Sequence, residues 1–383
     1  MLEILAILGI YAAIYITNPF IIIFHELGHA FAHLILTKPK KINVFIGSYG
    51  DTKTKLNLKI GKLHFYVKPS LFFINGGICQ SYSAEPSYKK RVIILLAGPL
   101  VSFFVACLIG FFVFDSEIHG VVKLYFFALI ICSFISLITN LRPSTIKNTN
   151  IDNDGKQLLF TIRIRKVYTD YVLANEKFLR GEYIYSAEQF LQIIAFFPHE
   201  ENIMRPLITS LLMTKRWTEA EKYLTEFTQY RYPNTEDYLN WGYLHSVTNR
   251  SQLAIENYKK ALSYDPNNLI GLNNLGYELA LKGEYAEGQK ILEQAIEIDP
   301  KFSHPYGNLG YLKILSSKLD EGKQLIEKSI ELDPNNAYAY KHLGVYYLKT
   351  GDKGKALVNF NKALELDSSF NMESFFQEAE LLS

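Results

Sequence analysis

The most constraining feature of the sequence is a group of ionisable side chains inside an apolar segment. A His-Glu-x-x-His pattern, with His25, Glu26 and His29, lies within residues 4–36, which are otherwise almost uncharged. On a helix, residues four apart share one face, so the two imidazoles could hold one Zn²⁺ while Glu26 lies beside it as a base for water. Ionisable groups in hydrocarbon are costly and usually functional. The pattern therefore indicates a metal site of the metallohydrolase kind and disfavours a set of solvated side chains.

The apolar stretch of residues 2–36 is expected to cross a membrane once. As a helix it would be about 50 Å long, against a hydrocarbon thickness of about 30 Å. Asn18-Pro19 leaves no room for a hairpin between two spans, so we expect one tilted or proline-kinked helix. Two more apolar runs predict spans over residues 92–114 and about 121–141.

The same helix carries His33, which continues the series of histidines at intervals of four residues. It lies about 12 Å along the helix from His25, whereas a zinc–nitrogen bond is about 2.1 Å. His33 therefore cannot share an ion with His25, and we expect it to support or pack against the site.

The chain between the first two spans is basic and predicts short strands. Residues 38–91 contain eleven Lys or Arg but only two acidic residues, Asp51 and Glu85. Apolar and polar residues alternate over 42–48, 55–60 and 63–68. These segments predict either a small sheet beside the metal site or a plain connecting hairpin. Residues 73–77, with paired glycines, either dip into the membrane beside the site or form an ordinary turn.

Three stretches of the first 160 or so residues together resemble the site-2 protease family, intramembrane zinc metallopeptidases that cut within or next to transmembrane segments. They are the His-Glu-x-x-His pattern, an Ala-Gly-Pro motif at residues 97–99, and an Asn-x-x-Pro pattern at 140–143 followed by Asp-Gly at 154–155. The resemblance implies that one zinc ion is bound by His25, His29 and Asp154 with water as the fourth ligand. It implies catalysis by Glu26 and shaping of the active site by Gly98, Pro99, Asn140 and Pro143. An edge strand of the small sheet could pair with an unwound substrate.

The sequence departs from the family pattern in two places. Ser102 stands where the family often has Asn, and the gap from Pro143 to Asp154 is longer than the commonest form. Asp152 therefore competes with Asp154 as the third ligand. Either aspartate could instead belong to a polar turn before a helix.

The C-terminal half has a period of 34 residues. Asp-Pro pairs recur at 265–266, 299–300 and 333–334, as do Gly242, Gly276, Gly310 and Gly344. This pattern is typical of tetratricopeptide repeats, an α-solenoid of paired helices. We expect a membrane-embedded metallopeptidase domain over 1–160, a linker and two degenerate repeats over 161–234, four repeats over 235–370, and a capping helix over 371–383. The predicted fold is mainly α, with about three transmembrane helices and a small β-hairpin or sheet insertion before the solenoid.

Such arrays bind protein segments on a concave face. Tyr243, Tyr277 and Tyr311 fall at one repeat position and form either a partner-binding aromatic ladder or ordinary interhelix packing. The expected partners are a membrane-protein substrate, a protein or peptide in the groove and the lipid bilayer, with no nucleic acid. With only three cysteines in the sequence, we expect no disulfide.

Flanking charges predict the orientation in the membrane. The loop between spans one and two and the segment after span three are basic, whereas residues 115–119 hold two acids and no Lys or Arg. By the positive-inside rule, the N-terminus lies outside and the repeats lie in the cytosol, in a multi-pass protein of a bacterial cell membrane. The leading interpretation is a zinc endopeptidase with a recruiting or gating array. The alternative is a membrane-anchored scaffold with a non-proteolytic metal site.

Overall fold

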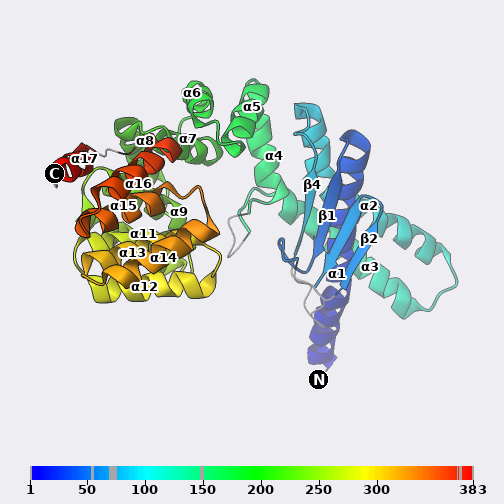
Figure 1. Cartoon of the computed structure of the whole chain (residues 1–383). Helices are drawn as coiled ribbons and strands as arrows, with labels where there is room; N and C mark the ends of the chain where they lie inside the picture. Colours follow the sequence, from blue (N-terminus) through cyan, green and yellow to red (C-terminus); the bar gives the residue numbers. More distant parts are fainter. Residues whose placement is uncertain are drawn as a thin grey trace. The chain divides into compact units, whose positions relative to one another are not determined.

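Figure 1 shows the computed structural model of the chain, which describes residues 2–52, 56–68, 76–146, 151–368, 370 and 373–381, without the side chains of residues 2–15 and 378–381. The chain divides into two units, Met1–Glu176 and Lys177–Ser383. The first unit contains long apolar helices and a small sheet, and the second consists of paired helices. The mainly α architecture predicted from the sequence is confirmed.

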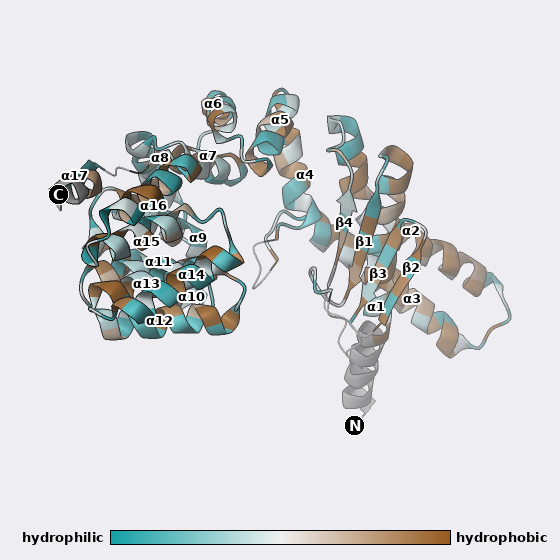
Figure 2. Cartoon of the chain, in the orientation of Figure 1, coloured by the Kyte–Doolittle hydropathy of each residue, from teal (hydrophilic) through white to brown (hydrophobic). Residues whose placement is uncertain are grey.

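Three long helices of the first unit are apolar enough to cross a membrane. The helix α1 (Leu2–Leu36) is continuous through Pro19, as expected for a single crossing, and α2 (Tyr88–Asp115) and α3 (Gly120–Leu141) follow. Among the described residues the candidate spans are Ile16–Leu36, Tyr88–Asp115 and Gly120–Leu141. Figure 2 shows apolar residues along these helices. Helix α1 packs against both α2 and α3, so the turn of α1 that carries His25 and His29 lies among the other apolar helices.

The insertion between α1 and α2 is a four-stranded sheet and not a plain hairpin. Its strands are β1 (Lys41–Ile46), β2 (Leu56–Ile60), β3 (Leu63–Val67) and β4 (Gly77–Tyr82), in the order β2-β3-β1-β4. Strand β1 pairs in parallel with β3 and antiparallel with β4. Ile42 and Val44 of β1 pack in one cluster with Ala30 of α1, which fixes the sheet against the ligand-bearing helix.

The strand β4 was not predicted from the sequence. It is a short segment in which glycine, cysteine, glutamine and serine give little apolar–polar alternation, and its pairing with β1 is what orders it as a strand. The predicted dip of residues 73–77 towards the membrane falls partly outside the described residues. Its last residue, Gly77, begins β4.

The first unit ends in two helices beyond the last span. After α3 the chain makes a turn that includes a bridge between Thr145 and Asp152. Helix α4 (Asp154–Arg163) follows, with Asn153 as its N-cap, and then α5 (Tyr168–Leu179), which runs across the boundary between the two units.

The second unit is a succession of antiparallel helix pairs. Its helices are α6 (Tyr183–Ile194), α7 (Glu201–Met213), α8 (Trp217–Tyr230), α9 (Thr235–Val247), α10 (Ser251–Tyr264), α11 (Leu269–Leu281), α12 (Tyr285–Ile298), α13 (Ser303–Leu315), α14 (Leu319–Leu332), α15 (Ala337–Lys349), α16 (Lys353–Leu366) and α17 (Glu373–Leu381). The repeated glycines mark close approaches within each pair. A Cβ on Gly344 of α15 would lie 2.3 Å from the ring of Phe360 of α16, so only glycine fits.

Candidate metal centre

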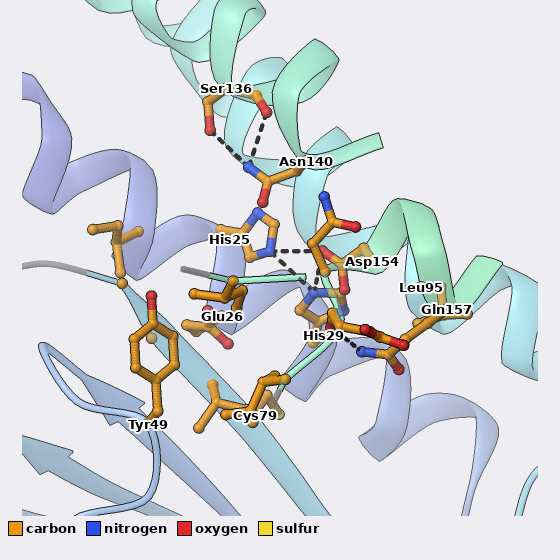
Figure 3. Close-up of a pocket in the computed structure, with 18 of the residues that line it drawn as sticks. His25, Glu26, His29, Tyr49, Cys79, Leu95, Ser136, Asn140, Asp154 and Gln157 are labelled. Atoms are coloured by element: carbon orange, nitrogen blue, oxygen red, sulfur yellow. Dashed lines mark hydrogen bonds and ion pairs between the residues drawn. The ribbon is translucent and has the colours of Figure 1, made fainter. Parts of the chain in front are cut away.

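Three side chains from two distant parts of the chain meet at one point. His25 Nε2 lies 3.2 Å from His29 Nε2, and Asp154 Oδ2 lies 3.0 Å from His25 Nε2 and 3.3 Å from His29 Nε2. All three residues are largely removed from solvent, and Figure 3 shows them pointing at one another from α1 and from the start of α4. Among the described residues they form a group whose ligand atoms lie within 4.8 Å of one another.

The spacing of these atoms fits a tetrahedral zinc ion. Zinc binds histidine nitrogen and carboxylate oxygen at about 2.0–2.2 Å, and tetrahedral ligands at that radius are about 3.3 Å apart. The observed separations, 3.0 to 3.3 Å, match that edge length. Two neutral imidazoles and a carboxylate are also a donor set that zinc prefers, with one position left for water or substrate. The residues present therefore fit the ion.

Helix α2 fixes the orientation of His29. The Nδ1 atom of His29 lies 2.8 Å from the backbone oxygen of Ile94, so it donates a hydrogen bond there and leaves Nε2 for the metal. A Cβ on Gly98, one turn further along α2, would lie 2.2 Å from His29 Nε2. Any side chain at this position would occupy the space of the ligand atom. This contact gives the glycine of the Ala-Gly-Pro motif a direct steric reason.

We expect Gly98→Ala to lower zinc affinity at least tenfold, because the His29 ring cannot keep its position beside a methyl group. Loss of a residue that orients a metal ligand typically lowers metal affinity about 10–100-fold. The matched control is Gly110→Ala in the same helix. There the added Cβ would meet the far end of the Ile130 side chain, which can move. Zinc titration measures the affinity of both variants, and circular dichroism checks that each keeps its helical content. Equal zinc affinities would contradict the steric role of Gly98.

The turn before α4 separates the two candidate aspartates. Asp152 forms an ion pair with Lys156 at 2.8 Å and accepts a hydrogen bond from Thr145 at 3.0 Å, so its carboxylate is held away from the histidines. Asp154 is instead the first residue of α4. Burial alone would raise the pKa of the Asp154 carboxyl, but its contacts with the His29 and His25 imidazoles hold that pKa well below its usual range. The carboxylate at the metal group is thus ionised.

Two neighbours of Asp154 fix its place. The Asn153 side chain donates to the backbone oxygen of Arg142 at 2.7 Å and accepts from the backbone nitrogens of Ser144 and Lys156 at 3.0 and 2.9 Å. It therefore joins the end of α3 to the first turn of α4. A Cβ on Gly155 would lie 2.3 Å from the backbone oxygen of Leu141, so the Asp-Gly pair lets α4 lie directly against α3. The glycine was predicted from the Asp-Gly motif, but Asn153 was not, although asparagine is a preferred N-cap residue before a helix.

The other predicted shaping residues lie around this group with different contacts. Asn140 lines the same pocket and donates from Nδ2 to the backbone oxygen and the hydroxyl of Ser136, which leaves its carbonyl oxygen for other partners. Ser102 donates to the backbone oxygen of Pro99 at 3.0 Å, inside helix α2. Pro143 lies in the turn just after α3 and is exposed. The structure thus brings Gly98 and Asn140 to the site and leaves Pro143 at its margin.

The metal group opens into a pocket of about 380 Å³. Glu26 lines it beside β4: a Cβ on Gly77 would lie 2.9 Å from Glu26 Oε1, so the strand passes directly over the carboxylate. Tyr49 and Cys79 lie on the same side, and sequence reasoning missed both (Figure 3). Burial and the charge of Glu26 raise the pKa of Tyr49. Burial raises the pKa of the Cys79 thiol, and Cys79 is not part of the group of three metal-binding side chains.

The far wall of the pocket is polar and joins α2 to α4. Arg91 donates to the side-chain oxygen of Gln157 at 2.9 Å, and Gln157 donates to the backbone oxygen of Asp152 at 2.8 Å. His33 also lines the pocket, with no described hydrogen-bond partner for its buried Nδ1. It is not part of the three-ligand group. Both Arg91 and Gln157 were missed, because nothing in their local sequence connects residues 66 positions apart.

In the repeat unit the three predicted groove tyrosines do not form one ladder. Tyr277 stacks on Tyr311 with ring centres 6.2 Å apart, and Tyr311 stacks on His342 at 4.2 Å. Tyr243 instead meets the edge of Trp217. His342 is fully buried, and burial holds its pKa well below the usual range. The tyrosines are half-buried, so they both pack between repeats and keep some surface.

A polar chain accompanies this stack. Asn308 donates to Asn273 at 2.9 Å and lies 3.3 Å from His342 Nε2. This polar chain was not predicted from the sequence. Asparagines recur every 34 residues at positions 240, 274 and 308, with His342 at the next equivalent position, so the pattern marks Asn308 and His342 but not Asn273.

Comparison with known proteins agrees with the two-part organisation. The N-terminal part of the sequence matches the Peptidase M50B-like family over residues 1–143. Residues 1–143 form a peptidase M50B-like domain. Tetratricopeptide repeat families match residues 238–268, 271–302, 303–336 and 337–370. The predicted combination of a site-2 protease domain and a C-terminal tetratricopeptide array is confirmed.

Several solved structures resemble part of the chain. A thermophilic TPR protein of Thermus thermophilus, TTC0263, is 19% identical, with 48% of this chain and all of that chain covered and a TM-score of 0.42. MamA from Desulfovibrio magneticus RS-1 is 24% identical, with 44% and 96% covered and a TM-score of 0.34. No curated protein matches the sequence. The peptidase M50B-like domain and the apolar helices indicate a peptidase-type membrane protein, and the repeats indicate protein or peptide partners.

Proposed function

We propose that this protein is a membrane-embedded zinc endopeptidase that cleaves within or near transmembrane segments of membrane proteins. The observation that carries the proposal is the meeting of His25, His29 and Asp154 at zinc-ligand spacing beside Glu26. The peptidase M50B-like domain supports the reaction class. The enclosure of the ligand-bearing turn by apolar helices supports a membrane substrate, since the site lies among spans and not in a soluble domain.

Each residue then has a defined task. His25, His29 and Asp154 would hold the ion, and bound zinc supplies a Lewis acid that polarises the scissile carbonyl and makes water a stronger nucleophile. Glu26 accepts the proton of the attacking water and donates it to the leaving amine. Ile94 and Gly98 hold the His29 ring in place, and Asn153 holds Asp154. The side-chain nitrogen of Asn140 donates to Ser136. Its side-chain carbonyl oxygen can therefore accept a hydrogen bond from a backbone N–H of the substrate.

Removal of the metal tests the proposal directly. Treatment of the purified protein with a zinc chelator is expected to abolish cleavage of membrane-protein substrates, and added Zn²⁺ is expected to restore it, because three protein ligands cannot acidify water without the ion. Elemental analysis should find one zinc per chain before treatment. Cleavage that persists in the metal-free protein would refute a zinc peptidase. Full zinc content without any cleavage in native membranes would favour the scaffold alternative.

The repeat array is proposed to recruit or gate substrates and to take no part in chemistry. It follows α5, and a partner or substrate tail that it binds gains effective concentration at the site without any new contact at the scissile bond. The hydrogen bond from Tyr168 to the backbone oxygen of Pro86 belongs to the first unit, so the informative deletion begins after Glu176 and keeps that bond. We expect the deletion to keep bound zinc and to change which membrane proteins are cleaved, or how fast. Identical cleavage profiles would show the array to be incidental to proteolysis.

The orientation proposal has its own test. The positive-inside rule supports a cytosolic location for the basic segment between α1 and α2 and for the basic residues beyond α3. A reporter in the loop of residues 115–119 should report an external location, and one fused to the end of the repeats should report the cytosol. The opposite pattern would refute this orientation.

A further inference from the structure

Helix α4 exposes an apolar and basic face immediately beyond the membrane spans. Leu159 and Ile162, one turn apart, are 36% and 50% exposed. Arg163 continues this face, and Arg165 and Lys166 are exposed in the turn before α5. We call these five residues the juxtamembrane face. Apolar side chains beside flexible basic ones are the composition of helices that lie at a membrane surface.

The contacts of α4 place this face near the ends of the spans. Gln157 of α4 accepts a hydrogen bond from Arg91 in the first turn of α2. Gly155 lies against Leu141, the last residue of α3. After the turn, Tyr168 packs edge-on against the ring of Tyr88 and donates to Pro86. Helix α4 is therefore held at the boundary where α2 begins and α3 ends, which is where lipid headgroups surround spanning helices.

The charges around this boundary are mainly positive. Lys89 and Lys90 at the start of α2 are exposed and add to the basic residues of the juxtamembrane face. Five acidic side chains of the described residues lie nearby. Glu85 lies 4.0 Å from Arg91, Asp152 is paired with Lys156, and Asp154 contacts His25 and His29, while Asp170 and Glu176 lie on α5. Basic side chains next to a span attract anionic lipid. They are long enough for the charged group to reach the headgroups while the methylene chain lies along apolar surface.

We propose that the juxtamembrane face binds the surface of a membrane that contains anionic lipid. Leu159 and Ile162 enter the outer edge of the acyl region, and Arg163, Arg165 and Lys166 contact the negatively charged headgroups. A lipid surface fits better than a protein partner because the face is fixed at the membrane boundary by the contacts of α4 with α2 and α3, and because its apolar and basic residues are interleaved. The inference does not depend on the zinc chemistry.

The test uses the full-length protein in lipid nanodiscs and a tryptophan placed at position 162. Quenching of tryptophan fluorescence in Ile162→Trp is measured in discs of brominated phosphatidylcholine, alone and with about 30% unbrominated phosphatidylglycerol. The parent protein, whose own tryptophans are Trp217 and Trp241, gives the background in each lipid. Bromine quenches tryptophan only in the acyl region. We expect at least about twofold stronger quenching with the anionic lipid, because basic residues near the surface strengthen its attachment.

Charge variants complete the test. Arg165→Glu with Lys166→Glu, and the milder double change to Gln, are expected to abolish the increase caused by anionic lipid. The matched control reverses two exposed lysines of the repeats, Lys290→Glu with Lys301→Glu, and should keep it. Circular dichroism checks that each variant is folded. Quenching that is the same with and without anionic lipid, or that survives both charge variants, would overturn the proposal and favour a protein as the occupant.

Discussion

Glu26→Gln is expected to lower peptide cleavage by at least about 100-fold while bound zinc stays near one per chain. General acid–base catalysis contributes about 10²–10⁴-fold, and an amide cannot carry the proton. Glu26 does not belong to the group of three metal-binding side chains, so its replacement should leave zinc binding unchanged. The measurement is cleavage of a membrane-protein substrate together with zinc content by elemental analysis.

Glutamine is the appropriate replacement because the space around Glu26 is tight. A Cβ on Gly77 of strand β4 would lie only 2.8 Å from Glu26 Cγ, and a replacement of the same shape avoids a second structural change. Full cleavage by this variant would remove Glu26 from the mechanism. A parallel loss of zinc would instead assign it a role in holding the metal.

Asp154→Ala is expected to weaken zinc binding on the order of 100-fold or more, whereas Asp152→Ala should change it little. Loss of a residue that only supports a ligand already costs about 10–100-fold, and removal of a ligand should cost at least as much. Asp152 has its own partners in Lys156 and Thr145, so it serves as a matched control two residues away. Zinc titration with a competing chelator measures both variants.

The reverse result would mean that the metal recruits Asp152 and that the turn before α4 rearranges on binding. Equal and small effects would contradict a carboxylate ligand in this turn altogether. A useful intermediate variant is Asn153→Ala, which removes the hydrogen bonds that place Asp154 but keeps its carboxylate. We expect a loss of zinc affinity between those of the two aspartate variants.

The sequence was sufficient for the part of the site that lies on one helix. Spacing of four residues brings His25 and His29 together on any helix, so their proximity needs no tertiary information. The third member of the group depends on tertiary structure. Asp152 and Asp154 are indistinguishable by local pattern, and their separation follows from the contacts of Asn153 and Gly155 with the end of α3.

The same distinction holds for the fold. The spans and the 34-residue repeats carry strong periodic patterns, and both were predictable. Strand β4 has no such pattern and is defined by its partner β1, from which β2 and β3 separate it in the sequence. In the repeats, equal sequence positions did not give equal contacts: Tyr311 stacks on His342, whereas Tyr243 meets Trp217 from a degenerate repeat that offers a different neighbour.

The order of strands in the small sheet has a consequence for how the site assembles. The hairpin of β2 and β3 can close locally, but β1 must then pair with β3 in parallel, and β4 can only add to the remaining edge of β1. Contacts between residues far apart in sequence form slowly because chain entropy must be lost first. Since β4 lies beside Glu26 at Gly77, the carboxylate side of the pocket is closed only when β4 is paired with β1. Enclosure of Glu26 therefore depends on pairing between strands far apart in the sequence and not on the helix that carries this residue.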